Sequence, residues 1–182
     1  RKGLPQCSAR LKGAWNQRYA RFYGVYPQVK NGDQSLVLSP QNHEGTPYVD
    51  FMANTDIKQQ VDLMTAYSGD VVYEAQGVAP NSSLKFYHAL TAISFSVGNN
   101  LSYPDKIKKI EIKNAISKGR FVMQTAANGM GSKWEKLSDR KTFTLGDIDV
   151  QTKNVPGQRI VGDGTDNYTF LMIPQKLDNV EV

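Results

Sequence analysis

Short apolar segments that alternate with polar residues recur along this chain, and turn-forming residues separate them. Val, Ile, Tyr, Phe and Thr are frequent in these segments and favour extended backbone. Gly, Asn and Asp are frequent between them and favour turns. The pattern predicts an all-β sandwich or barrel whose strands cover residues 19–26, 48–52, 71–75, 84–97, 109–113, 121–123, 143–145 and 168–173.

Residues 84–97 contain a change of phase in this alternation. Up to residue 90 the apolar side chains fall on even positions, and from residue 93 they fall on odd positions. Because side chains alternate faces with a period of two, one regular strand would expose one of the two sets. We therefore expect a bulge, a bend or a switch between sheets between Leu90 and Ile93. With that correction, the side chains expected to be buried are Leu84, Phe86, Leu90, Ile93, Phe95 and Val97.

One segment also has a helical interpretation. Asp56 and Gln59 could cap a helix, and Ile57, Val61 and Met64 would then share one helical face. A single turn of helix and a loop that enters a strand both fit this short segment. A parallel sheet is not expected, because no segment is long enough to form helical crossovers between parallel strands.

Length and charge narrow the class of protein. The chain has 182 residues, 40% hydrophobic residues and 21% charged residues, which fits one large folded domain. No run approaches the roughly 18 consecutive apolar residues of a membrane helix. The net charge of +5 could indicate an anionic partner. We favour a solvated sheet face, because the densest basic run, at Lys106, Lys108 and Lys109, has Asp105 and Glu111 beside it.

The residues that most often carry chemistry are few. His43 lies in a polar segment that is expected to be a loop, whereas His88 occupies an apolar position of the strand 84–97. We expect His88 to be buried or half-buried and bound to the backbone or a nearby polar group, without a metal. Cys7 is the only cysteine, so no disulfide forms within the chain, and we interpret it as a plain thiol.

Three short motifs suggest binding chemistry, and each has a simpler interpretation. Residues 129–133 (GMGSK) lack the first glycine and the following helix of a phosphate-binding loop. Asp163, Asp166 and Asn167 offer oxygen ligands without the spacing of an EF-hand. Residues 18–23 (RYARFY) mix basic and aromatic side chains, as single-strand binders do, but also fit an ordinary strand. We expect no catalytic, cofactor-binding or metal-binding residue and no nucleic-acid partner.

Several segments, taken in order, resemble the fimbrillin family of Bacteroidales. The most characteristic are the phenylalanine, histidine, alanine and leucine of the long strand and the closing Ile173-Pro174-Gln175. The full series comprises residues 51–54 (FMAN), 62–66 (DLMTA), 84–95 (LKFYHALTAISF), 107–114 (IKKIEIKN), 119–121 (GRF) and 170–175 (FLMIPQ).

The resemblance implies a transthyretin-like Greek-key β-sandwich, mostly antiparallel and with at most a short helix. Residues 1–176 would form the N-terminal domain of a subunit, and residues 177–182 would begin a second domain that this chain does not contain. It also implies export as a lipoprotein, anchoring at the outer membrane, display on the cell surface and assembly into fimbriae. Partners would be other fimbrial subunits and surface ligands of host or bacterium, with membrane contact only through a lipid anchor.

In this family, subunits polymerise by strand exchange after a protease cuts behind an arginine near the N-terminus. Arg1 and Arg10 are the candidate cleavage positions here, because Arg18 and Arg21 fall in or beside the first expected strand. The alternative function is a secreted carbohydrate-binding module, in which Trp15 and Trp134 would stack on sugars. An enzyme is not expected, because the sequence shows no catalytic constellation.

Overall fold

A computed structural model describes the fold over residues 6–11, 19–30, 32–72, 81–98, 105–153, 155–160 and 168–182, with residues 6–11 described by their backbone alone. The chain divides into two compact units. Unit 1 contains residues Arg1–Met52, Asp62–Ala89 and Gly119–Lys136, and unit 2 contains Ala53–Val61, Leu90–Lys118 and Leu137–Val182.

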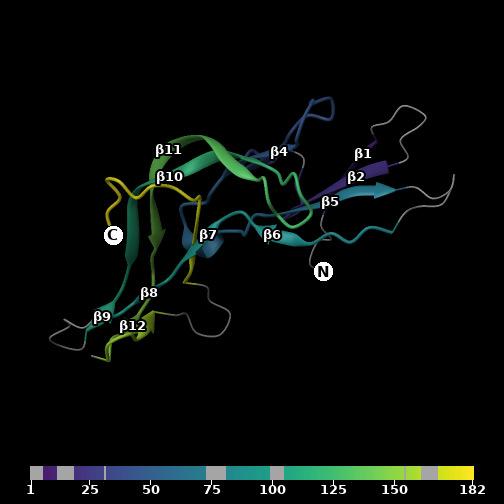
Figure 1. The fold of residues 1–182 in the computed structure, drawn as a ribbon. Helices are drawn as coiled ribbons and strands as arrows, with labels where there is room; N and C mark the ends of the chain where they lie inside the picture. The colour runs from purple at the N-terminus through teal and green to yellow at the C-terminus, as the bar shows by residue number, and fades with distance from the viewer. Residues whose placement is uncertain are drawn as a thin grey trace. The chain divides into compact units, whose positions relative to one another are not determined.

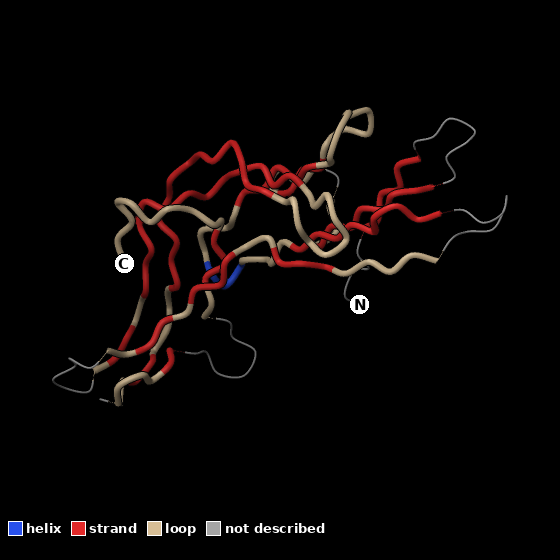
Figure 2. The backbone as a smooth tube through the Cα atoms, in the orientation of Figure 1, coloured by secondary structure: helices blue, strands red, loops and turns tan. Residues whose placement is uncertain are grey.

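The described residues form an all-β protein whose named strand pairs are antiparallel (Figures 1 and 2). The first strands are β1 (Gln6–Leu11), β2 (Tyr19–Tyr26), β3 (Leu36–Leu38), β4 (Tyr48–Met52), β5 (Met64–Val72), β6 (Phe86–His88), β7 (Thr91–Ile93) and β8 (Phe95–Ser96). The later strands are β9 (Lys106–Ile107), β10 (Ile110–Val122), β11 (Lys133–Leu145), β12 (Val150–Gln151), β13 (Arg159–Ile160) and β14 (Phe170–Met172). The all-β prediction is therefore confirmed, whereas the transthyretin-like Greek-key order stays a prediction.

In unit 1, one sheet has the strand order β1-β2-β5-β6. The predicted strand 19–26 is β2, and it pairs with β1 on one side and β5 on the other. Tyr23 and Tyr67 are opposite each other in this register and stack with ring centroids 4.6 Å apart. The sheet buries aromatic and aliphatic side chains of its inner strands, among them Ala20, Tyr23, Val25, Ala66 and Tyr67.

A second sheet has the order β11-β10-β4-β3. Strand β4 has the predicted bounds and the predicted alternation, with Val49 and Phe51 buried between half-buried neighbours. Strand β10 is longer than predicted, because it joins the predicted strands 109–113 and 121–123 into one of 13 residues. Both strands of the pair β10 and β11 contribute residues to each unit.

A change of phase divides strand β10. Ile112 is buried on an even position, whereas Ala115, Ser117 and Phe121 are buried on odd positions. Asn114, between the two sets, has a φ of 59°, the left-handed conformation found in bulges. This extra residue lets one long strand keep both sets of side chains inside.

Strand β11 carries two similar irregularities in an exposed stretch. Lys136 has a φ of 52° and Asp139 a φ of 57°. Residues 136–142 are all exposed, and they include two lysines, an arginine and an aspartate. Only Phe143 and Leu145, at the end of the strand, are fully buried.

In unit 2, three short antiparallel pairs join segments far apart in the chain: β12 with β9, β13 with β8, and β14 with β7. Phe95 and Phe170 meet edge-to-face at 5.4 Å. The buried apolar side chains of this unit include Ile57, Leu90, Val97, Ile112, Phe143, Leu145, Ile148, Ile160, Phe170, Met172 and Ile173.

The expected correction in residues 84–97 is a switch between sheets. Strand β6 pairs with β5 in unit 1, whereas β7 and β8 pair with β14 and β13 in unit 2. The expectation of full burial is correct for Leu90 and Val97 and wrong for the other four residues, which are half-buried: Leu84, Phe86, Ile93 and Phe95. The strands are only two or three residues long, so few neighbours cover their side chains.

The segment with a helical interpretation forms one turn of 3-10 helix, Ile57–Gln59. The Asp56 carboxylate caps this turn by accepting a hydrogen bond from the Lys58 N–H. Over the part of the chain that the structure describes, no helix has the length and apolar character to cross a membrane. The division into a domain of residues 1–176 and a following domain stays a prediction.

Two phenylalanines of unit 2 differ in burial, so their replacement by alanine should destabilise the protein by different amounts. Phe143 is fully buried, so Phe143→Ala should lower the free energy of unfolding by about 3–5 kcal/mol. Phe95 is half-buried, and Phe95→Ala should cost about 1–2 kcal/mol. Urea unfolding of the two variants checks this. Equal losses would show that the burial is assigned wrongly.

Candidate functional site

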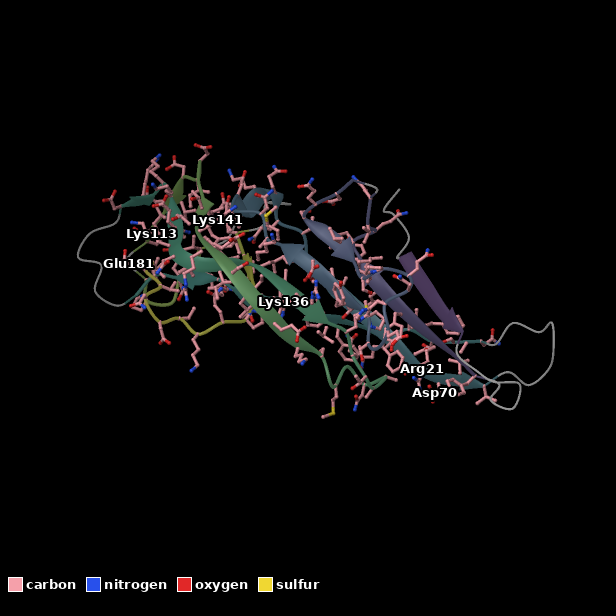
Figure 3. The ribbon with its side chains drawn as sticks, turned by 90° about the horizontal axis from the view of Figure 1, so that it is seen from above. Arg21, Asp70, Lys113, Lys136, Lys141 and Glu181 are labelled. Atoms are coloured by element: carbon pink, nitrogen blue, oxygen red, sulfur yellow. The ribbon has the colours of Figure 1, made fainter. Side chains whose placement is uncertain are left out.

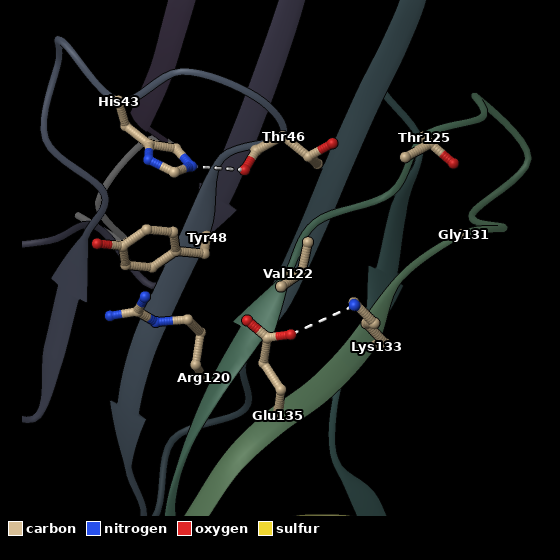
Figure 4. A pocket seen from close by; sticks show the side chains of 9 residues that line it. All are labelled: His43, Thr46, Tyr48, Arg120, Val122, Thr125, Gly131, Lys133 and Glu135. Carbon is tan, nitrogen blue, oxygen red and sulfur yellow. Dashed lines mark hydrogen bonds and ion pairs between the residues drawn. The ribbon is translucent and has the colours of Figure 1, made fainter.

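A cleft of about 380 Å³ opens in unit 1 over strands β4, β10 and β11 (Figure 4). Side chains from all three strands line it, together with the loop before β4 and the loop between β10 and β11. The lining residues are His43, Thr46, Tyr48, Arg120, Val122, Thr125, Gly131, Lys133 and Glu135.

Arg120 on β10 is the most tightly held side chain of the cleft. Its Nε and Nη2 donate hydrogen bonds of 2.7 and 2.8 Å to the two carboxylate oxygens of Asp50. Its guanidinium carbon lies 3.5 Å from the centroid of the Tyr48 ring, a cation–π contact. Tyr48 and Asp50 are two residues apart on β4 and therefore share one face, which gives Arg120 both contacts at once. The hydrogen bonds to Asp50 raise the pKa of Arg120 above its ordinary value.

His43 extends this arrangement on the other side of Tyr48. Its Nε2 donates a hydrogen bond of 3.2 Å to the carbonyl oxygen of Thr46. Its ring meets the Tyr48 ring edge-on, with centroids 5.0 Å apart. Figure 4 shows Tyr48 between His43 and Arg120.

The charges of the cleft are balanced. Lys133 and Glu135, two residues apart on β11, form an ion pair at 3.3 Å. Asp50 likewise neutralises Arg120. A site without net charge does not attract the phosphates of nucleic acid, and the Nε2–H of His43 is already engaged by a carbonyl. The geometry therefore suits hydrogen bonding to a polar surface better than acid–base chemistry.

The loop that closes the cleft contains the segment 129–133. Thr125 N–H and Ala126 N–H both donate to the Met130 carbonyl, at 3.0 and 3.2 Å. Gly131 has a φ of 83°, and a Cβ there would lie 1.9 Å from the Thr125 hydroxyl, so only glycine fits. The segment leads into strand β11, so the expectation that no helix follows it is confirmed.

His88 is exposed, so the prediction that it is buried or half-buried is wrong. Its side chain is 69% exposed and its Nδ1 is hydrogen-bonded to the Asp62 carboxylate. The position in the apolar phase misled the prediction, because β6 is a three-residue strand at the edge of its sheet. The expectation of a nearby polar partner is confirmed.

Two of the predicted processing and stacking residues, Arg10 and Trp134, lie in the described part of unit 1. Arg10 lies in β1, opposite Arg21 of β2. The Trp134 indole packs against Phe51 and Phe121, and its Nε1 donates to the Ala89 carbonyl at 2.9 Å. This packing competes with the stacking role on sugars. The described residues do not include Arg1, Trp15, Asp163, Asp166 and Asn167.

The densest basic run is neutralised by neighbouring carboxylates in unit 2. Asp149 accepts hydrogen bonds from Lys106 Nζ at 2.9 Å and from Lys108 Nζ at 2.8 Å. Lys109 pairs with Glu111 at 3.1 Å. These pairs agree with a solvated face rather than an anion site. Within the described ranges, no three His, Cys, Asp or Glu side chains are grouped to hold a metal ion.

The sequence matches the family model described as fimbrillin-like over residues 13–182. The matched range contains every described strand from β2 onward, and β1 precedes it. No curated protein and no solved structure matches the sequence.

Two Arg–Asp pairs of unit 1 should differ in their effect on stability. The Arg120 side chain is 19% exposed, whereas the Arg21 and Asp70 side chains are 40% and 50% exposed. Asp50→Ala should lower the free energy of unfolding by about 1–2 kcal/mol, because it leaves a half-buried guanidinium without its partner. Asp70→Ala should cost clearly less, because water and salt screen that pair. Urea unfolding at low and high salt measures both, and equal costs would contradict the assignment.

The ion pairs of Asp149 predict a pH effect. Hydrogen bonds from Lys108 and Lys106 hold the pKa of Asp149 below its ordinary value. Because the folded pKa is below the unfolded one, the stabilisation is present above the unfolded pKa of about 3.9 and is lost as the pH falls through the folded pKa. Replacing both lysines by methionine should raise the Asp149 pKa, as measured by NMR titration. An unchanged titration would show that the pairs do not persist in solution.

Proposed function

Because the chain belongs to the fimbrillin-like family, we propose that it is a structural subunit of bacterial fimbriae that joins its neighbours by strand exchange. The family is structural rather than enzymatic, and its members assemble with other fimbrial subunits at the cell surface. The charge-balanced cleft, with His43 bonded to a backbone carbonyl, supports a role without catalysis.

The position of β1 is the observation that carries the proposal. This strand lies at the edge of its sheet and contacts β2 along its full length, from Gln6 opposite Val25 to Leu11 opposite Ala20. Its removal would break only one ladder and would leave the N–H and C=O groups of β2 unpaired above the buried Ala20 and Val25. A strand from a neighbouring subunit would satisfy these groups and cover the same side chains.

Arg10 is the better of the two cleavage candidates under this proposal. A cut behind Arg10 falls just before Leu11, the last residue of β1, and would detach nearly the whole strand. A cut behind Arg1 would leave β1 attached. An edge strand opens more readily than a central one, which would give a protease access to the bond.

Export as a lipoprotein, anchoring at the outer membrane and binding of surface ligands are further proposals that rest on the family. A carbohydrate-binding module is the second candidate, and the cleft favours it by offering hydrogen-bonding side chains without net charge. Saturable glycan binding that Arg120→Ala or Trp15→Ala abolishes would support this candidate.

Strand exchange predicts a defined product after proteolysis. The protein expressed from its complete gene and treated with an Arg-specific protease should form a ladder of oligomers that resists denaturing gel electrophoresis without boiling. Arg10→Lys keeps the charge but removes the cleavage position, so it should abolish the ladder. If the cut protein stays monomeric, or if Arg10→Lys polymerises as well as the unchanged protein, cleavage behind Arg10 does not drive assembly.

A further inference from the structure

The Gln175 side chain takes the place of a paired strand beside β10. Its Oε1 accepts a hydrogen bond of 2.7 Å from the Ile116 N–H, and its Nε2 lies 3.3 Å from the Ile116 carbonyl oxygen, to which it donates. The same Nε2 donates to the Ile173 carbonyl at 3.1 Å. One carboxamide thus satisfies the backbone donor and acceptor that a neighbouring strand would otherwise pair.

The segment that follows is attached to β10 a second time. The Lys113 N–H donates to the Glu181 carbonyl at 2.8 Å, and the Glu181 N–H donates to the Lys113 carbonyl at 3.3 Å. The Asn114 side chain donates to the Asn179 carbonyl at 2.8 Å. Figure 3 shows Lys113 and Glu181 next to each other. We call residues 174–181 the strap.

The bulge in β10 explains why the strap meets both attachment positions. Backbone groups of a strand point to alternate sides, so residues three apart normally point in opposite directions. The extra residue at Asn114, with its φ of 59°, brings Lys113 and Ile116 to the same side. Both then face one passing segment.

The strap covers apolar surface without filling it. A pocket of about 190 Å³ lies among β7, β10, β14 and the strap. Its apolar lining residues include Ile93, Ile112, Ala115, Met172, Ile173 and Leu177. Leu177 of the strap is 63% exposed, so its side chain does not occupy this space. Few backbone hydrogen bonds and an open pocket are features of segments that open locally before the rest of a fold.

We propose that the strap is a latch on β10, with Gln175 as the residue that closes it. While closed, it occupies the backbone positions of Lys113 and Ile116 and shields the pocket. Its release exposes these positions to the strap of a second copy of this chain, which carries the same backbone groups and the same apolar Leu177. The proposal uses neither β1 nor an arginine, so it stands apart from the proposed function.

Amide hydrogen exchange tests whether the strap opens as one unit. Gln175→Met keeps the length of the side chain and removes its hydrogen bonds. If Gln175 closes the latch, the amides of Lys113 and Glu181 should exchange about tenfold faster in this variant, although Gln175 contacts neither. The Thr144 amide, bonded to the Thr55 carbonyl in the same unit, should not change. The control variant Lys176→Ala alters an exposed neighbour of Gln175. It should leave the exchange of all the monitored amides unchanged, which are those of Lys113, Ile116, Thr144 and Glu181.

Two results would overturn the latch. Faster exchange at Ile116 alone would show that Gln175 makes only a local bond. Equal acceleration at Thr144 would show that the whole unit loosens. Asn114→Gly is a second test of the strap that remains if Gln175→Met fails to fold. Glycine adopts a φ of 59° without strain, so this variant loses only the hydrogen bond from the Asn114 side chain to the Asn179 carbonyl. It should accelerate Lys113 and Glu181 without affecting Thr144.

Binding of a strand is tested directly with a fluorescent peptide of residues 172–182 (MIPQKLDNVEV). The peptide should bind Gln175→Met saturably and should bind neither the unchanged protein nor Lys176→Ala. No binding to Gln175→Met, or equal binding to all three proteins, would contradict the proposal.

Discussion

Each backbone N–H and C=O at the side of a strand needs a hydrogen-bond partner, and this need governs how the protein is arranged. Central strands such as β2 and β4 meet it with neighbours on both sides. Where regular pairing is interrupted, side chains meet it: the Gln175 carboxamide serves Ile116, and the Ser117 hydroxyl of β10 serves the carbonyl of the left-handed Asp139 on the neighbouring β11 at 2.6 Å. The position of Ile116, where a side chain stands in for a strand, is a place where the sheet can be opened or extended.

Charged side chains are likewise paired with partners that lie close to them in the sheet. On β4, Tyr48 and Asp50 share a face and hold Arg120 from two directions. On β11, Lys133 and Glu135 share a face and neutralise each other. Near β12, Asp149 is held by two lysines. A net charge of +5 therefore produces no concentrated basic site in the cleft or in this basic run.

Periodicity in the sequence predicted the strands β2 and β4 with their observed bounds, but it divided β10 in two and found only residues 143–145 of β11, where the strand is buried. It also placed a bulge, bend or sheet switch between Leu90 and Ile93, and the structure shows a sheet switch there. It missed β1, because residues 6–11 (QCSARL) show no alternation and are held by backbone pairing with β2. The spacing of Tyr48 and Asp50 was a visible signal for a shared face, but their partner Arg120 is 70 residues from Asp50, beyond any local pattern. The apolar positions shift from even to odd numbers around Asn114, and this shift was also visible in the sequence. Interpreted as a bulge, it would have joined the two predicted strands 109–113 and 121–123 into one.

Strand β11 shows what such irregularities do for a protein that is rich in sheets. It is the outermost strand of its sheet and one of the two longest, so a flat, apolar version would be a template for edge-to-edge aggregation. The left-handed residues Lys136 and Asp139 interrupt its hydrogen-bonding row, and the charged side chains between residues 136 and 142 would have to be desolvated by any added strand. A strand of another molecule would therefore find few matching backbone partners along this edge.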